Sequence, residues 1–347
     1  MAGPAREVAA TRSAVRVALD DLPPGARVLV ACSGGADSLA LAAAAGFVAG
    51  RRGWRAGGVV VDHGWAPDSA AVAGRAAAHC RSLGLDPVMV LAAGPQDGPG
   101  GPEAAARKAR YAVLERVADR LDAAAVLLGH TLDDQAATVL LGRARGSGSR
   151  SLAGMPAVRG RYRRPLLGLT RADTERACAA LGLAPWQDPA NDDPAYLRSR
   201  LRAVMPMLGA ALGPGLAQAL ARTAALLAED AAALDDLAVA ALLAATLGPD
   251  PSVRPDRSVG PDRLEVAVLA AEPVAVRRRA LLAAARRAGS PAGSLGRAHV
   301  LALDALLTAW HGQGPVSLPG GVEARRDCGR LLLVPPPAAS APADFTR

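Results

Sequence analysis

The stretch LVACSGGADSLALAAAA, residues 29–45, decides how the first half of the chain is interpreted. A short apolar run leads into serine, glycine and aspartate residues, and an alanine-rich run follows. This order predicts a buried strand, a tight turn over residues 33–38 and a helix over residues 38–50. A glycine-rich turn before a helix offers backbone N–H groups and a positive dipole end to an anion. The 33–38 loop is therefore a candidate phosphate site, and an ordinary tight turn is the alternative.

The composition of the 33–38 loop narrows its ligand. No GK[ST] sequence follows, so it is not a Walker A loop, and it does not match the GxGxxG dinucleotide fingerprint. A carboxylate at Asp37 repels phosphate unless a magnesium ion lies between them, which favours ATP bound with Mg²⁺ on Asp37. The expected nucleotide-binding residues are Ser33, Gly34, Gly35, Ala36, Asp37 and Ser38.

Strand and helix patterns alternate around this loop. The alternation predicts an α/β fold, with a parallel sheet covered by helices on both faces. Ligands of such sheets bind at the carboxyl ends of the strands, where Ser33, Asp62, His63 and His130 are expected to lie. The predicted helices span Val8–Leu22, 38–50, 68–83 and 102–121, and the later strands span 57–64, 86–92 and 124–130.

The pattern changes near residue 206. Helical periodicity dominates residues 215–245, 274–288 and 295–310, and residues 314–335 predict a hairpin. We therefore expect a catalytic domain over residues 1–208, a smaller and mainly helical domain over 209–334, and a disordered Pro/Ala-rich tail over 335–347.

Charge and cysteine usage bound the function further. The formal net charge is +8, a sign typical of proteins that meet polyanions. The four cysteines are scattered, with no CxxC motif and no zinc spacing, which indicates reduced thiols. No signal-peptide pattern and no long apolar run is present, which predicts a cytoplasmic protein without a membrane span.

Further motifs resemble those of one enzyme family. SGGADS after a strand is similar to the PP-loop of the N-type ATP pyrophosphatases, which adenylate a carbonyl oxygen and release pyrophosphate. Within that superfamily the chain resembles the tRNA(Ile)-lysidine synthetases over most of residues 26–208. The matching segments are VVVDHGW (59–65), EAAARKARYAVL (103–114), LLGHTLDDQAATVLLGRARGSGSRSLAGM (127–155) and the block over 164–208. The resemblance implies an adenine nucleotide α-hydrolase-like catalytic domain, followed by a looser match over 274–334.

The resemblance also implies a reaction. Such a ligase uses ATP to adenylate C2 of the cytidine at the first position of the CAU anticodon of tRNA(Ile). The amine of free L-lysine then displaces AMP, and the lysidine formed changes the codon read from AUG to AUA. ATP, Mg²⁺, L-lysine and tRNA(Ile) are the implied ligands, and a homodimer is the assembly that the family suggests. The implied catalytic residues are Asp37, His130, Asp133, Asp134 and Arg200; Asp62 and His63 join the nucleotide site; and Arg107, Arg110, Asp134, Arg198 and Arg202 contact the other substrates.

Spacing gives part of this site independently. His130, Asp133, Asp134 and Ala137 share one helix face after a strand, where two carboxylates suit a metal or an ammonium group. The alternatives are an acidic helix start favoured by the dipole and a packing role for His130 or His63. The family usually has glutamate where this chain has Ala137 and asparagine where it has Ser199, so Asp134 or another acid is expected to replace the missing carboxylate.

Runs of arginine without acids predict phosphate-binding surfaces. The alternative for the second run is a solubilising helix face. The first arginine run comprises residues 143, 145, 150, 159, 161, 163, 164 and 171, and the second comprises residues 277, 278, 279, 286, 287 and 297.

Two rival functions remain. One is a tRNA thiolase, which usually needs a cysteine pair or iron–sulfur ligands, and the other is a tRNA-binding protein that has lost its enzyme activity.

Overall fold

A computed structural model describes residues 3–64, 68–94, 102–144, 148–189, 193, 197–246 and 262–336. The chain divides into two compact units, Met1–Ala228 and Glu229–Arg347. Residues 209–228, which the sequence analysis assigns to the second domain, therefore group with the first unit. Residues 337–347 of the predicted tail lie outside the described part.

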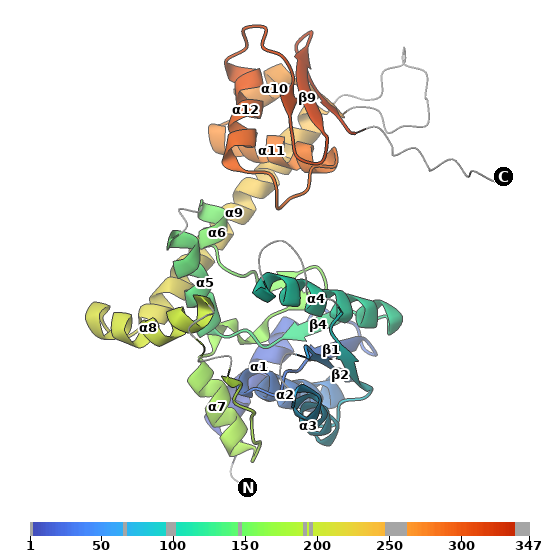
Figure 1. The fold of residues 1–347 in the computed structure, drawn as a ribbon, viewed down its shortest axis with the longest axis vertical. Coiled ribbons are helices and arrows are strands. Elements are labelled where there is room, and N and C mark those ends of the chain that lie inside the picture. The colour runs from blue at the N-terminus through green and yellow to red at the C-terminus, as the bar shows by residue number, and fades with distance from the viewer. Residues whose placement is uncertain are drawn as a thin grey trace, which may run out of the picture. The chain divides into compact units, whose positions relative to one another are not determined.

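The first unit is built around a six-stranded sheet in the order β3-β2-β1-β4-β6-β5. Figure 1 labels its strands β1, β2 and β4. Strands β1 to β4 and β6 run parallel, while β5 pairs antiparallel with β6. The predicted parallel sheet is confirmed, and the β5–β6 edge was not predicted. The strands are β1 (Arg27–Ala31), β2 (Arg55–Asp62), β3 (Val88–Ala92), β4 (Ala125–Leu128), β5 (Val158–Arg159) and β6 (Tyr162–Arg163).

Helices cover both faces of this sheet, as the alternating pattern predicted. Val28 and Val30 of β1 pack into a core with α1, α2 and α3, whereas Leu29 and Ala31 face the core under α4. The helices are α1 (Arg6–Ala18), α2 (Ala36–Arg52), α3 (Ser69–Ser82), α4 (Pro102–Arg120), α5 (Leu132–Ala144), α6 (Ser149–Leu152), α7 (Arg171–Ala180) and α8 (Leu197–Leu212), with a 3₁₀ turn η1 (Pro165–Gly168).

The strand order creates a switch point beside β1. From β1 the chain continues to β2 and β3 on one side, and it returns to β4 on the other. The connections that leave β1 and β4 therefore diverge at their carboxyl ends, which is where open α/β sheets bind ligands. The residues that follow these two strands are the 33–38 loop and the segment from Gly129 to Asp134. The fold thus brings together two segments that are about 95 positions apart in sequence.

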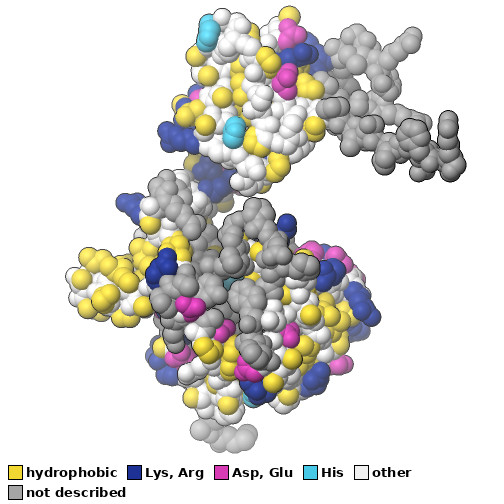
Figure 2. Space-filling view, in the orientation of Figure 1, with side chains coloured by type: hydrophobic (Ala, Val, Ile, Leu, Met, Phe, Trp, Pro, Cys, Tyr) yellow, Lys and Arg dark blue, Asp and Glu magenta, His cyan; other side chains and the backbone are white. Residues whose placement is uncertain are grey.

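Hydrophobic side chains remain exposed on α8 of the first unit. Met207 and Leu212 are 64% and 70% exposed, and the patch is visible over the α8 region in Figure 2. Helix α9 (Leu216–Ala245) follows α8 in the chain, in close agreement with the predicted helical pattern over 215–245.

The second unit contains an antiparallel sheet in the order β7-β10-β9-β8 with helices packed against it. The predicted hairpin is confirmed as β9–β10, and β7 and β8 extend it to four strands. Its elements are β7 (Asp262–Glu265), α10 (Val266–Ala271), α11 (Val274–Arg287), α12 (Arg297–Thr308), β8 (Val316–Ser317), β9 (Glu323–Asp327) and β10 (Arg330–Val334).

Candidate active site

The 33–38 loop is held in shape by its own hydrogen bonds. The Ser38 hydroxyl donates to the Gly35 carbonyl at 2.9 Å and accepts from the Ser33 backbone N–H at 3.2 Å. Gly34 has a φ of +87°, and a Cβ there would lie 3.3 Å from Ala76 of α3. Both conditions favour glycine. The loop therefore presents the first N–H groups of α2 in a preformed arrangement, while the buried Ser38 hydroxyl is engaged within the loop.

A cavity of about 710 Å³ lies beside this loop, and we call it the loop cavity. It is lined by residues from the ends of β1 and β2, by α3 and α4, and by Trp186, Asp188, Pro189 and Asp193. Trp186 donates its backbone N–H to the Gly34 carbonyl at 2.9 Å, so the chain at Trp186 is attached to the loop itself. The size is within the range of cavities that hold nucleotide-sized ligands. Among the predicted nucleotide residues it contains Ser33, Gly35, Asp62 and His63, together with Arg110.

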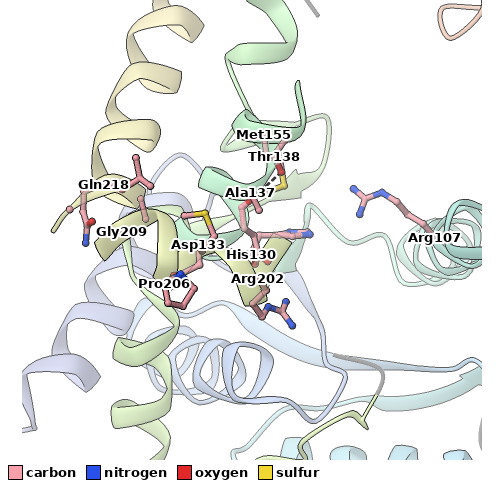
Figure 3. Close-up of a pocket in the computed structure, with 15 residues that line it drawn as sticks. Arg107, His130, Asp133, Ala137, Thr138, Met155, Arg202, Pro206, Gly209 and Gln218 are labelled. Carbon is pink, nitrogen blue, oxygen red and sulfur yellow. Dashed lines mark hydrogen bonds between the residues drawn. The ribbon is translucent and has the colours of Figure 1, made fainter. Parts of the chain in front are cut away.

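A second cavity, of about 510 Å³, lies at the start of α5, and we call it the aspartate cavity (Figure 3). Arg107 reaches toward it from α4, opposite His130 and Ala137. One wall is apolar, formed by Met155, Met205, Pro206 and Leu216 among others. The predicted residues that it brings together are Arg107, His130, Asp133, Asp134 and Arg202.

The paired aspartates have different local roles. Asp134 Oδ2 accepts hydrogen bonds from the Thr131 backbone N–H and hydroxyl, at 3.0 and 3.3 Å, and so caps α5. Asp133 Oδ2 accepts from the backbone N–H of Arg171, the first residue of α7, at 2.8 Å. The alternative of an acidic helix start therefore applies to Asp134 Oδ2 at the start of α5, whereas Asp133 Oδ2 binds the first N–H of a different helix, α7. Asp134 Oδ1 remains available beside the cavity, 4.0 Å from Arg171 Nη2.

Asp37 lies next to this pair, on the first turn of α2. Its side chain is 18% exposed, and it accepts a hydrogen bond from the Thr174 hydroxyl at 2.5 Å and an ion pair from Arg171 at 3.3 Å. Burial raises the pKa of the Asp37 carboxyl, and the negative charges of Asp134 and Asp133 raise it further. The two predicted parts of the site, the 33–38 loop and the aspartates of α5, therefore share one electrostatic environment.

The surroundings of both predicted histidines disfavour the charged imidazolium. Burial lowers the pKa of His130 to about 4, and the positive charges of Arg110, Arg164 and Arg107 lower it further against the attraction of Asp134. Burial also lowers the pKa of His63. A neutral imidazole offers one donor and one acceptor, so these residues can bind and orient a substrate without adding charge.

The arginines of α4 divide between the two cavities. Arg107 lines the aspartate cavity and Arg110 lines the loop cavity. Burial lowers the pKa of Arg110, and the neighbouring charge of Arg107 lowers it further. On α8, Arg202 lines the aspartate cavity, whereas exposed Arg200 is not among the described residues that line either cavity. The side chain of Arg198 lies outside the described part of the structure.

Several arginines of the two runs are paired within the fold, which does not favour a phosphate-binding role for those residues. In the first run Arg164 is buried and donates to the Pro156 carbonyl, while Arg161 and Arg163 pair with acids of α4 and the α1–β1 connection. In the second run Arg277 and Arg278 both pair with Asp304, and Arg279 pairs with Asp235. The acids come from distant segments, which a count along one run cannot include. Arg145 lies outside the described residues, and Arg143, Arg150 and Arg159 are exposed.

Sequence reasoning missed three contacts that shape the site. Arg171 and Thr174 hold Asp37, and they lie in a block that was recognised only as a family resemblance. Gln135 clamps Met155 through both of its amide atoms, at 2.7 and 3.1 Å. A Cβ at Gly154 would lie 2.7 Å from the Gln135 amide, so this clamp also requires the glycine. The sequence signal for this contact was that DDQ (133–135) and GM (154–155) occur in the same family motif.

The cysteines do not form a cluster site. Cys32, Cys80 and Cys178 are buried and Cys328 is exposed. A hydrogen bond from the Cys80 thiol, the largest cause, lowers the pKa of Cys32 to about 7, so the fold does bring these two together. Within the described residues, no group of three or more His, Cys, Asp or Glu side chains is arranged to hold a metal ion. The cysteines alone therefore do not decide against the thiolase alternative, since the fold does form one pair, and the comparisons with known proteins decide it.

Comparisons with known proteins agree with this geometry. A family profile described as "PP-loop domain" matches residues 9–208, and one described as "TilS substrate binding domain" matches residues 264–332. The tRNA(Ile)-lysidine synthase of Thermobifida fusca is 53% identical, over 96% of this chain and 99% of the relative. This chain belongs to the tRNA(Ile)-lysidine synthase family. The enzymes of that name from Salinispora tropica and Streptomyces coelicolor are also 53% identical, over 97% and 90% of this chain and 99% and 86% of their own lengths.

A solved structure supports the fold of this family member. The U34-tRNA thiolase NcsA from Methanococcus maripaludis, with its [4Fe-4S] cluster, matches with a TM-score of 0.55 and 20% identity. The match covers 64% of this chain and 80% of the thiolase chain. At this identity the likeness concerns the fold alone. In the part of this chain that the structure describes, no helix is long and apolar enough to cross a membrane.

Proposed function

We propose that this protein is an ATP-dependent ligase that joins L-lysine to C2 of the cytidine at the first anticodon position of tRNA(Ile) with a CAU anticodon. The observation that carries the proposal is the pairing of two cavities around one charge cluster. The loop cavity lies at a phosphate-binding loop, the aspartate cavity offers carboxylates beside an apolar wall, and Asp37 and Asp134 meet at Arg171. The working compartment of such a tRNA-modifying enzyme is the cytoplasm, and a homodimer remains a prediction.

The first half-reaction is adenylation. The N–H groups at the start of α2 bind the departing β- and γ-phosphates, while Ser33 and Gly35 line the wall of the loop cavity. The C2 oxygen of the cytidine attacks the α-phosphorus, and the bond to the bridging oxygen of pyrophosphate breaks. Arg110 in the loop cavity stabilises negative charge on the α-phosphate, and we assign Arg198, Arg200 and Arg202 to the tRNA or to the same phosphate.

Asp37 suits a magnesium ion bound together with ATP. Magnesium binds proteins through one or two carboxylates and takes its other ligands from phosphates and water, so the single half-buried Asp37 is a sufficient protein donor. When bound, the ion neutralises charge on the departing pyrophosphate. Asp37 itself is oriented by Thr174 and Arg171, which fix its carboxylate at the edge of the loop.

The second half-reaction is amine transfer. The aspartate cavity accepts L-lysine, with Asp134 facing an ammonium group, Asp133 beside it and the apolar wall covering the methylene chain. The ε-amine nitrogen of lysine, in its neutral form, attacks C2, the bond from C2 to the adenylated oxygen breaks, AMP leaves with that oxygen, and the new C–N nitrogen releases a proton to solvent. The neutral His130 contributes a hydrogen bond rather than a charge. Asp133 and Asp134 supply the negative charge that the glutamate usual in the family at position 137 would otherwise contribute.

Incorporation of labelled lysine into a CAU-anticodon tRNA(Ile) transcript with Mg-ATP tests the proposal, with the same tRNA carrying uridine at the target position as control. We expect label in the cytidine tRNA only. AMP formation without label would mean that the amine acceptor is wrong, and the absence of both would favour a binding protein without enzyme activity. We expect Asp37→Asn to abolish AMP formation and Asp134→Asn to weaken lysine transfer, whereas Asp119→Asn, on an exposed residue of α4, should behave as wild type.

A further inference from the structure

Arg171 is the residue on which the charges of both cavities converge. Its Nη2 lies 3.3 Å from Asp37 Oδ2 and 4.0 Å from Asp134 Oδ1. Its backbone N–H donates to Asp133 Oδ2 at 2.8 Å. The first residue of α7 therefore contacts one carboxylate of the 33–38 loop and both carboxylates of the aspartate cavity.

Arg171 does not itself face a substrate. It is not among the described residues that line either cavity, and its side chain is 29% exposed. Its influence on the reaction must therefore pass through the three aspartates. The negative charges of Asp134 and Asp133 repel the carboxylate of Asp37. One guanidinium between them offsets this repulsion and keeps the side chains from turning apart.

The shape of the guanidinium matters as well as its charge. Both ion-pair contacts are made by Nη2, whose two N–H donors have directions fixed by the planar guanidinium, whereas a lysine ammonium rotates freely as a compact point charge. The Nε of Arg171 is buried and has no hydrogen-bond partner among the described residues, so the carboxylates are what hold the charged end of this side chain.

We propose that Arg171 is a positioning residue that couples the two half-reactions, by orienting Asp37 for Mg-ATP and Asp134 for the amine substrate. This inference rests on the proposed function. Because each contact is charge-assisted but partly exposed, loss of the guanidinium is expected to change each affinity about fivefold to tenfold.

The test compares three variants of the full chain. Arg171→Met removes the charge and keeps the apolar stem, and Arg171→Lys keeps the charge without the fork. Arg176→Met is the matched control, because Arg176 lies on the same helix and pairs with Glu7 and Asp173, away from both cavities. The readouts are the Kd for Mg-ATP without tRNA, the KM for lysine, kcat and the thermal unfolding midpoint.

We expect Arg171→Met to raise both the Mg-ATP Kd and the lysine KM about fivefold to tenfold, and Arg171→Lys to recover at most one of them. Arg176→Met should match wild type in both. A lower unfolding midpoint or kcat with both affinities unchanged would show a merely structural role and overturn the proposal. A change in only one affinity, or full recovery by lysine, would overturn the coupling. Failure of the proposed function is distinguishable, since wild type would then transfer no lysine while its Mg-ATP Kd could still be measured.

Discussion

Gly129 lies where the end of β4 meets the start of α2, and its replacement by alanine tests how rigidly the two are joined. A Cβ at this position would lie 3.1 Å from the carbonyl carbon and oxygen of Asp37 and 3.2 Å from Ser38 Cα. Favourable contacts between carbon atoms begin near 3.5 Å, so the backbone of the 33–38 loop must move by about 0.3 to 0.4 Å. The neighbours are backbone atoms at a helix start, which cannot rotate away as a side chain can.

We expect Gly129→Ala to lower the free energy of unfolding by about 1–3 kcal/mol, the usual cost of overpacking. A displacement of this size at the phosphate-binding loop is expected to weaken Mg-ATP binding by about threefold to tenfold, since misplacement of about 1 Å can cost about 100-fold. Chemical denaturation and a direct Mg-ATP titration measure the two effects. Gly50→Ala is the control, because Gly50 lies in α2 with open space around it. This substitution should raise the free energy of unfolding by about 0.5–1 kcal/mol. Wild-type stability and ATP affinity in Gly129→Ala would refute the reasoning.

Three further predictions concern buried or exposed charges. On acidification the His130 imidazole of the unfolded chain, with a pKa near 6.5, binds a proton before folded His130 does with its pKa of about 4. The wild type therefore loses stability as the pH falls through this window. His130→Gln should reduce the loss of unfolding free energy between pH 7.5 and 5 by about 1–2 kcal/mol, measured by urea titration at each pH. Asp304→Asn leaves the buried guanidinium of Arg277 uncompensated and should cost about 3–5 kcal/mol of unfolding free energy, and an unchanged denaturation midpoint would contradict this. Arg143→Gln should lower the slope of log tRNA affinity against log salt by about one, whereas Arg163→Gln should leave it unchanged, because Arg163 is paired within the fold.

Much of the fold could be predicted because its signals are local. The helices over 102–121 and 215–245 differ from α4 and α9 by about one residue, since long periodic segments carry a strong pattern. The β5–β6 pair could not be seen, because strands of two residues have no periodicity. Strand β7 was missed for a different reason, because it is short and pairs with β10 from a segment about 70 residues away.

The site was predictable to the extent that its residues follow strands. His130 and Asp134 both line the aspartate cavity because β4 ends directly before them, but α5 begins at Leu132, so His130 precedes the helix and does not share its face as predicted. The roles of charged residues were harder to predict, because an ion pair such as Arg163 with Asp21 joins segments 142 positions apart. Arg171 was counted among the arginines of a phosphate-binding surface, and only the fold shows that it contacts three carboxylates.

The division of Arg107 and Arg110 between two cavities has a consequence for how α4 can vary in length. Three residues along a helix correspond to a rise of about 4.5 Å and a turn of about 300°. The helix therefore fixes both the spacing and the relative direction of Arg107 and Arg110. Insertion of one residue between them would rotate one arginine by about 100° relative to the other and point it away from its substrate. Helix α4 can therefore accept many substitutions on its other faces, but no insertion or deletion within this one turn.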